Sequence, residues 1–232
     1  MSARLHEFNS GADLAEGLAD AVSAALAEAI AARGKATLAV SGGSTPKAFF
    51  KALSGRDIDW AKVTVTLVDE RFVPADNPRS NHQLVSGNLL QGKAKAAGFL
   101  PLYREAGSAG EAARLVSADA ASLGAPFDVA ILGMGTDGHT ASFFPGGNNL
   151  AEAISAETPC GVITMEADGA GETRLTFTFA SLQDARLLVL HIEGQGKKDV
   201  LAAAEADGPE TDMPIRAILR RAATPVDIYW AP

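Results

Sequence analysis

The chain has 232 residues, 47% of them hydrophobic and 21% charged, a composition that excludes a disordered or fibrous protein. Its net charge of −8 argues against a general nucleic-acid surface, because phosphate backbones bind to clustered lysine and arginine. The single cysteine, Cys160, excludes an internal disulfide, and no Cys/His group has the spacing of a zinc site.

The N-terminal segment is unlike a secretory signal, because acidic residues interrupt its apolar face. No window approaches the roughly 20 apolar residues that span a bilayer. We therefore expect a cytoplasmic protein that binds neither nucleic acid nor membrane.

Residues 11–33 are predicted to form the first helix. Apolar residues recur at every fourth position from Leu14 to Ile30, which is the spacing of one helix face. Ser10 and Asp13 form a capping pair before this face, and Gly34 stands where a helix C-cap belongs.

Strands and helices then alternate along the chain. Such alternation predicts a single doubly wound α/β domain over residues 1–232, with one mostly parallel sheet and helices on both faces. The segment 173–179 alternates Thr with Leu and Phe, which is compatible with a half-exposed strand antiparallel to the others. The remaining strands are expected at 36–40, 63–68, 127–132 and 186–192, and the remaining helices after Pro46 and at about 81–90, 109–123 and 195–206.

The loop after the first of these strands has the composition of an anion cradle. Glycines let backbone N–H groups approach a ligand, hydroxyls add donors, and a helix N-terminus follows. A tight strand-to-helix turn with Ser44 or Thr45 as N-cap is an equally good interpretation. The loop is not a nucleotide P-loop, because Lys47 comes two residues too late. It consists of Ser41, Gly42, Gly43, Ser44 and Thr45.

Asp69, Glu70 and Arg71 follow the next strand, at an edge of the sheet where ligands gather. Arg71 is suited to bidentate phosphate binding, although a surface ion-pair cluster has the same composition. The turn that comes next enters a helix with Ser80 or Asn81 as its cap, and Asn81 is a further candidate to face the ligand.

Residues 133–138 match the pattern GxGxxG, but a dinucleotide site is a poor interpretation. The match lies past the middle of the chain, and Pro145 interrupts any long helix behind it. His139 ends this glycine-rich loop, with Asp137 two residues earlier, and a neutral imidazole there is suited to take a proton from water.

Most lone histidines are structural, and that is the interpretation for His6, His82 and His191. Arg174 and Lys197 are candidate cationic partners of a phosphate. A solvated helix surface is the alternative for Lys197 and its neighbour Lys198.

Together these motifs resemble the 6-phosphogluconolactonase family, within a wider group that includes glucosamine-6-phosphate deaminase. Asp69-Glu70-Arg71 stands where deaminases typically carry Asp-Glu-Tyr, and the continuation after His139 also favours the lactonases. His82 departs from the aromatic residue that lactonases commonly have there. The resemblance spans nearly the whole chain, in the segments 38–46, 68–71, 80–82, 133–146 and 174–178.

The resemblance implies hydrolysis of 6-phosphogluconolactone to 6-phosphogluconate in the pentose phosphate pathway, without metal or organic cofactor. His139 would activate water, Asp137 would orient the imidazole or a substrate hydroxyl, and backbone N–H groups of residues 133–138 would stabilise the oxyanion. The partner is a small phosphorylated sugar lactone, and a monomer is slightly favoured. A deaminase or isomerase and a non-catalytic sugar-phosphate-binding protein stay as alternatives. The expected substrate contacts are Ser41, Gly42, Gly43, Ser44, Thr45, Asp69, Arg71, Asn81, Arg174 and Lys197.

Overall fold

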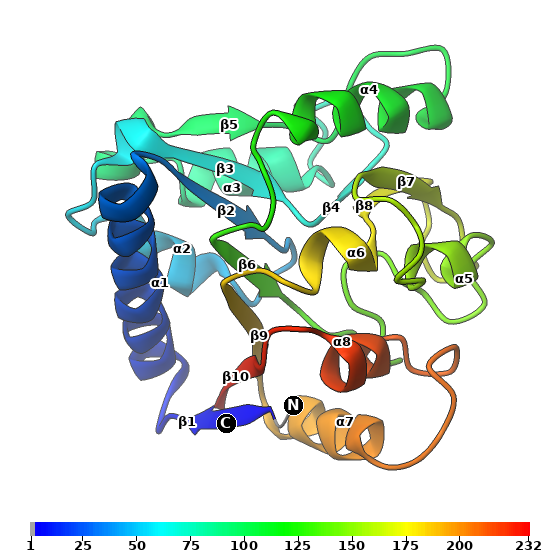
Figure 1. The fold of residues 1–232 in the computed structure, drawn as a ribbon. Helices are drawn as coiled ribbons and strands as arrows, with labels where there is room; N and C mark the ends of the chain where they lie inside the picture. Colours follow the sequence, from blue (N-terminus) through cyan, green and yellow to red (C-terminus); the bar gives the residue numbers. More distant parts are fainter. Residues whose placement is uncertain (1–2) are drawn as a thin grey trace.

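Seven parallel strands form the main sheet of the computed structural model, which describes residues 3–232 (Figure 1). The central strands are buried at every residue and read as continuous apolar runs, as strands covered on both faces do. In spatial order the strands are β1 (Arg4–Glu7), β10 (Val226–Ala231), β9 (Leu187–Glu193), β6 (Val129–Leu132), β2 (Ala36–Val40), β3 (Val63–Leu67) and β5 (Gly98–Leu100).

Helices cover both faces of this sheet, with α1 and α2 on one side and α6, α7 and α8 on the other (Figure 1). Within residues 3–232, no helix has the length and apolarity to cross a membrane. The helices are α1 (Gly11–Arg33), α2 (Lys47–Ser54), α3 (Asn81–Asn88), α4 (Ala109–Ala121), α5 (Leu150–Ala153), α6 (Phe179–Leu182), α7 (Gln195–Glu205) and α8 (Ile215–Arg221), with short 3₁₀ turns η1 (Trp60–Lys62) and η2 (Gly92–Ala96).

The first helix confirms its prediction in both its bounds and its caps. The Ser10 hydroxyl accepts a hydrogen bond from the Asp13 backbone N–H at 3.1 Å. Gly34 ends the helix in the left-handed conformation, with φ of 76°. The predicted α/β architecture with a mostly parallel sheet is likewise confirmed.

A second, three-stranded sheet corrects the expectation of a single sheet. It is antiparallel and has the order β4 (Asp69–Arg71), β8 (Arg174–Phe177), β7 (Val162–Met165). The antiparallel direction predicted for β8 is correct, but the expected half-exposure is wrong, because all four of its residues are buried. The Thr176 hydroxyl donates to the Phe177 carbonyl and accepts from the Ser142 N–H, so the polar half of the alternation faces protein rather than solvent.

The strand order indicates where a ligand is expected to bind. From β2 the chain moves outward to β3 and β5, then crosses back to β6 and continues in the other direction to β9. In open α/β sheets, ligands bind beyond the carboxyl ends of the strands where the order reverses. Here that point lies between β2 and β6, and the loops that leave it are residues 41–46 and 133–139.

Candidate functional site

A cavity of about 360 Å³ opens at this reversal point. Every residue expected to contact substrate lines it, as does His139, while Asp137 lies outside the lining and reaches it through His139. Sequence reasoning missed three lining residues, Ala141, Phe144 and Gly169. The complete lining is Ser41, Gly42, Gly43, Ser44, Thr45, Asp69, Arg71, Asn81, Gly133, Met134, Gly135, His139, Ala141, Phe144, Gly169, Arg174 and Lys197.

The loop after β2 keeps the N–H groups of residues 42–45 for a ligand. Helix α2 has Pro46 at its N-cap and no side-chain capping bond, so Ser44 and Thr45 do not act as the caps that the alternative interpretation required. Across residues 3–232, the N–H groups of residues 42–45 have no hydrogen-bond partner. Gly43 takes a φ of 92°, a conformation that favours glycine. The loop is therefore a set of unpaired donors beside a helix N-terminus, which suits an anion.

The Ser41 hydroxyl has a different task from the rest of this loop. It donates to the Ile131 carbonyl at 2.9 Å and accepts from the Gly133 N–H at 3.0 Å. This single side chain therefore ties the 41–45 loop to the glycine-rich loop that carries His139.

Asn81 closes the cavity wall between the loop and β4. Its side-chain amide donates to the Asp69 carbonyl at 2.9 Å. A Cβ on Gly42 would overlap the Asn81 side chain, so only glycine allows this close approach. Ser80 is the N-cap of α3, because its hydroxyl accepts from the His82 N–H at 3.1 Å.

Arg71 and Arg174 stand opposite each other in the antiparallel pairing of β4 with β8. Like charges in directly opposed positions are destabilising, and the charge of Arg71 disfavours the charged form of Arg174. Burial lowers the pKa of Arg174; the Asp69 carboxylate opposes this shift and the Arg71 charge adds to it. Both arginines line the same cavity, so an anion bound there would relieve the repulsion.

Arg174 is held rigidly in this position. Its Nε and Nη2 donate to the Ala170 carbonyl at 3.3 and 2.6 Å, and its guanidinium carbon lies 5.4 Å from the centre of the Phe144 ring. The buried Asp69 carboxylate lies 3.8 Å from Arg174 Nη1 and accepts a 2.6 Å hydrogen bond from the Ser142 hydroxyl. Asp69 and Glu70 are both buried, so this segment is not a surface ion-pair cluster.

His139 and Asp137 form a dyad on the glycine-rich loop. The imidazole Nδ1 lies 2.6 Å from Asp137 Oδ1, which also accepts from the His139 backbone N–H at 3.1 Å. Burial raises the pKa of Asp137, but the hydrogen bonds and the positive charge of His139 outweigh it, and the net pKa is lowered. An ionised Asp137 accepts a hydrogen bond from the Nδ1–H group, which keeps the proton on Nδ1 and leaves Nε2 as the basic nitrogen of the ring.

Lys197 lies at the same end of the cavity, at the start of α7. Its Nζ donates to the Met134 carbonyl at 2.7 Å. Burial lowers the pKa of this amine, and the Asp137 carboxylate opposes the shift. The interpretation of Lys197 as a solvated surface lysine is therefore wrong, because its amine is fixed against the glycine-rich loop.

The backbone N–H groups of the glycines in that loop are not available to a ligand. Those of Gly135 and Gly138 donate to the carbonyls of His139 and Gly135, and that of Gly133 donates to the Ser41 hydroxyl. This geometry rules out the oxyanion role for the N–H groups of these three glycines, while the same expectation for the other residues of 133–138 stays a prediction. The N–H groups of Gly135 and Gly138 instead close the tight turn that presents His139.

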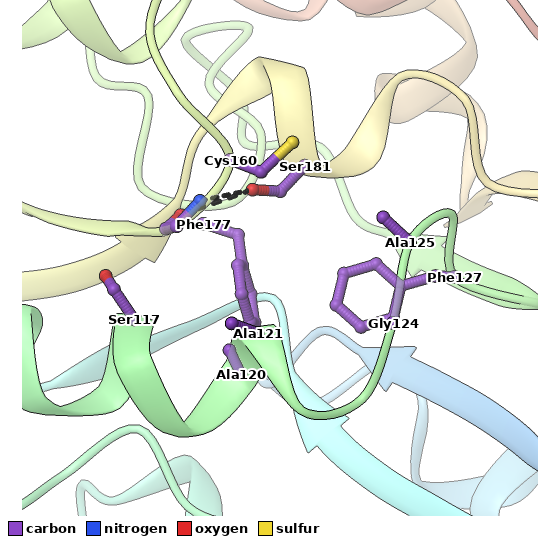
Figure 2. A pocket seen from close by; sticks show the side chains of 10 residues that line it. Ser117, Ala120, Ala121, Gly124, Ala125, Phe127, Cys160, Phe177 and Ser181 are labelled. Carbon is purple, nitrogen blue, oxygen red and sulfur yellow. Dashed lines mark hydrogen bonds between the residues drawn. The ribbon is translucent and has the colours of Figure 1, made fainter.

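A second cavity, of about 280 Å³, lies between α4 and α6 (Figure 2). Its lining is mostly apolar and contains no charged side chain, so it offers no partner to a phosphate. The Ser181 hydroxyl, labelled in Figure 2, is already engaged, because it accepts from the Gly161 N–H at 2.8 Å. The cavity at the reversal point is the better candidate site for a sugar phosphate.

His82 lies behind the site and yields a stability prediction. Its ring packs against Phe99 with the ring centres 4.6 Å apart and the planes tilted by 51°, and its buried Nδ1 has no hydrogen-bond partner within the described part of the chain. Burial lowers the pKa of His82, so the folded protein resists its protonation. The unfolded protein binds this proton more readily, so the folded state loses stability as the pH falls below the unfolded pKa of about 6.5. Above that pH, His82 is neutral in both states and causes no such loss.

We expect His82→Phe to stabilise the protein by about 1 kcal/mol at pH above 7, because it removes an unpaired buried polar atom. The gain should be larger near pH 5.5, since phenylalanine does not titrate. Thermal unfolding of both proteins at the two pH values measures this difference. An equal gain at both pH values would show that the pKa of His82 is the same in the folded and the unfolded protein.

The comparisons with known proteins agree along the whole chain. The profile of the family described as "Glucosamine-6-phosphate isomerases/6-phosphogluconolactonase" matches residues 9–230. A 6-phosphogluconolactonase from Rhizobium meliloti is 68% identical over 232 residues, covering 100% of both chains, and one from Mesorhizobium japonicum is 52% identical, covering 97% of this chain and 94% of its own. The crystal structure of a 6-phosphogluconolactonase from Shewanella baltica has a TM-score of 0.96 at 38% identity and covers 100% of this chain and 98% of that chain. The chain therefore belongs to the family of glucosamine-6-phosphate isomerases and 6-phosphogluconolactonases.

Proposed function

We propose that this protein hydrolyses 6-phosphogluconolactone to 6-phosphogluconate in the cytoplasm, as a step of the pentose phosphate pathway. One observation carries the proposal: a single cavity combines the His139–Asp137 dyad with the cations Arg71, Arg174 and Lys197. The relatives from Rhizobium meliloti and Mesorhizobium japonicum bear the name of this activity.

The 6-phosphate binds at the end of the cavity formed by residues 42–45, Arg71 and Arg174. Unpaired N–H groups and two opposed guanidinium groups surround this end. The net charge of the whole chain is −8, so the attraction for an anionic substrate has to come from this local group of cations. Phosphate binding fixes the sugar ring and presents its carbonyl to the other end of the cavity.

His139 acts there as general base. Its Nε2 takes a proton from the water that attacks the lactone carbonyl, and Asp137 stabilises the imidazolium that forms. The proton then passes to the ring oxygen as the ester bond breaks. A lactone is an activated ester, so a positioned water, a base and an oxyanion partner are sufficient for its hydrolysis.

Lys197 is our candidate for the oxyanion partner. Its amine donates to the Met134 carbonyl and keeps further N–H donors for the cavity. The Asp137 charge acts on the same amine, which places Lys197 near the dyad. The glycine N–H groups of the loop are engaged within the protein, so they do not compete for this role.

The test is a lactonase assay with purified protein, freshly generated 6-phosphogluconolactone and subtraction of the spontaneous rate. We expect rapid hydrolysis of the phosphorylated lactone and much slower hydrolysis of the plain lactone. Glucosamine 6-phosphate is tested in parallel for ammonia release. Ammonia release, or lactone decay at the rate of buffer alone, would contradict the proposal.

Arg71→Ala should reduce kcat/KM by about tenfold to a hundredfold, mainly through KM, because a charged hydrogen bond to the phosphate is lost. The preference for the phosphorylated over the plain lactone should shrink by the same factor. Arg79→Ala is the matched control, since Arg79 pairs with Glu172 and does not line the cavity. An unchanged preference in Arg71→Ala would remove Arg71 from the phosphate site.

A further inference from the structure

Glu70 is a buried carboxylate outside the cavity lining, and four donors converge on it. Its side chain is completely buried, with an exposed fraction of 0%. Oε1 accepts from the backbone N–H groups of Arg71 and Asn81, at 2.7 and 2.8 Å. Oε2 accepts from the Ser80 hydroxyl at 2.9 Å and from the His82 N–H at 2.8 Å.

The position of Glu70 on β4 explains this arrangement. Successive side chains of a strand point to opposite faces, so Glu70 points away from the face that carries Asp69 and Arg71. That direction leads to the first turn of α3, whose N–H groups have no partner within the helix. The carboxylate supplies the missing acceptor, and its negative charge suits the positive end of the helix dipole.

Two of the four donors belong to residues of the substrate cavity. The N–H groups of Arg71 and Asn81 meet at the same carboxylate oxygen, although the two residues belong to different elements. The Asn81 side chain in turn contacts Gly42 and the Asp69 carbonyl. A displacement of Glu70 would therefore reach both the arginine and the amide that face the substrate.

We propose that Glu70 is a positioning residue, which holds Arg71 and Asn81 in register on two sides of the substrate cavity. The inference rests on the proposed function for its effect on turnover. Its effect on geometry is independent of that function. Burial raises the pKa of the Glu70 carboxyl, while the hydrogen bonds from Asn81, His82, Arg71 and Ser80 oppose the shift by favouring the charged form.

The chain offers a matched control at the opposite end of the sheet. Asp128 is also a buried carboxylate, with an exposed fraction of 6%, and accepts from the backbone N–H and the hydroxyl of Thr37. It stands before β6, at the amino ends of the strands, whereas the cavity lies at their carboxyl ends. Replacement of Asp128 thus measures how much the loss of a buried carboxylate lowers the free energy of unfolding, without a change at the substrate cavity.

The experiment compares Glu70→Gln, Asp128→Asn and the unmodified protein. The amide of glutamine cannot accept at both ends, so it leaves at least one pair of donors without a partner. We expect kcat/KM for the phosphorylated lactone to fall about tenfold to a hundredfold in Glu70→Gln, mostly through KM, because small displacements of binding groups have effects of this size. Asp128→Asn should lower the unfolding temperature and leave KM within about twofold.

Amide hydrogen exchange gives the second readout. Exchange at Arg71, Asn81 and His82 should accelerate in Glu70→Gln and stay unchanged in Asp128→Asn. If the unmodified protein does not hydrolyse the lactone, the proposed function fails, while this exchange still tests the positioning role. If Glu70→Gln does not fold, Ser80→Ala removes one of the four donors and should raise KM by about threefold. Unchanged KM in whichever variant folds, or unchanged exchange at Arg71 and Asn81, would overturn the inference.

Discussion

His139→Ala should lower kcat by about 10²–10⁴-fold, which is the usual contribution of a general base. Binding of the phosphate end depends on other residues, so KM should change much less. The side chain of His139 is 32% exposed and is not part of the apolar core, so the variant should fold with nearly unchanged stability. Single-turnover and steady-state rates, corrected for spontaneous hydrolysis, measure the loss.

Two controls define the role of the dyad. Asp137→Asn keeps the size of the side chain but removes the charge that stabilises the imidazolium, so it should lower kcat by less than His139→Ala does. Binding of the product 6-phosphogluconate should be retained in both variants, because the phosphate end is intact. A His139→Ala protein with near-normal kcat would exclude His139 as the base.

Local patterns were sufficient for the elements and loops that lie close together in sequence. The apolar spacing in 11–33 and its caps at Ser10 and Gly34 predicted α1 in full. The apolar runs before residue 41 and residue 133 predicted buried strands, and the glycines after each predicted the loops at their carboxyl ends. These features depend on hydrogen bonds over a few residues, which the sequence displays directly.

Pairings over long distances were beyond such patterns. The register that sets Arg71 opposite Arg174 joins segments about a hundred residues apart, and no local period marks it. The strands β1 and β10 join the two ends of the chain and were not predicted. These strands carry polar residues that bind one another, because Arg4 and His6 of β1 both bind the buried Asp227 of β10. The two segments therefore lack the apolar pattern that predicts a buried strand.

The same limit explains the corrected details of the site. The composition of residues 133–138 indicated close backbone approach, but it could not show that the Gly133 N–H would bind the Ser41 hydroxyl from a different loop. Phe144 was visible in the sequence as an ordinary apolar residue. Only the fold places its ring 4.5 Å from that of His139 and beneath the Arg174 guanidinium.

Gly135→Ala should inactivate the enzyme although it replaces no side chain that contacts the substrate. A Cβ at this position would overlap the imidazole of His139 and press on the carboxylate of Asp137. Gly135 does not have a positive φ, so the backbone itself tolerates alanine and the effect is confined to the dyad. We expect a loss in kcat of about a hundredfold or more, with a destabilisation of about 1–3 kcal/mol from overpacking.

Gly133→Ala provides the matched control in the same loop. Its Cβ would meet only the Ser41 Cβ, at 3.9 Å, which is an ordinary contact, and its φ is not positive either. Gly133→Ala should therefore keep kcat within a few-fold of the unmodified protein. Because Gly135→Ala acts through the imidazole, the double variant Gly135→Ala/His139→Ala should be no slower than His139→Ala alone. Additive losses of kcat in that double variant would mean that Gly135 serves the reaction by another route. Equal losses in Gly133→Ala and Gly135→Ala would mean that the reaction depends on the loop as a whole rather than on the placement of His139.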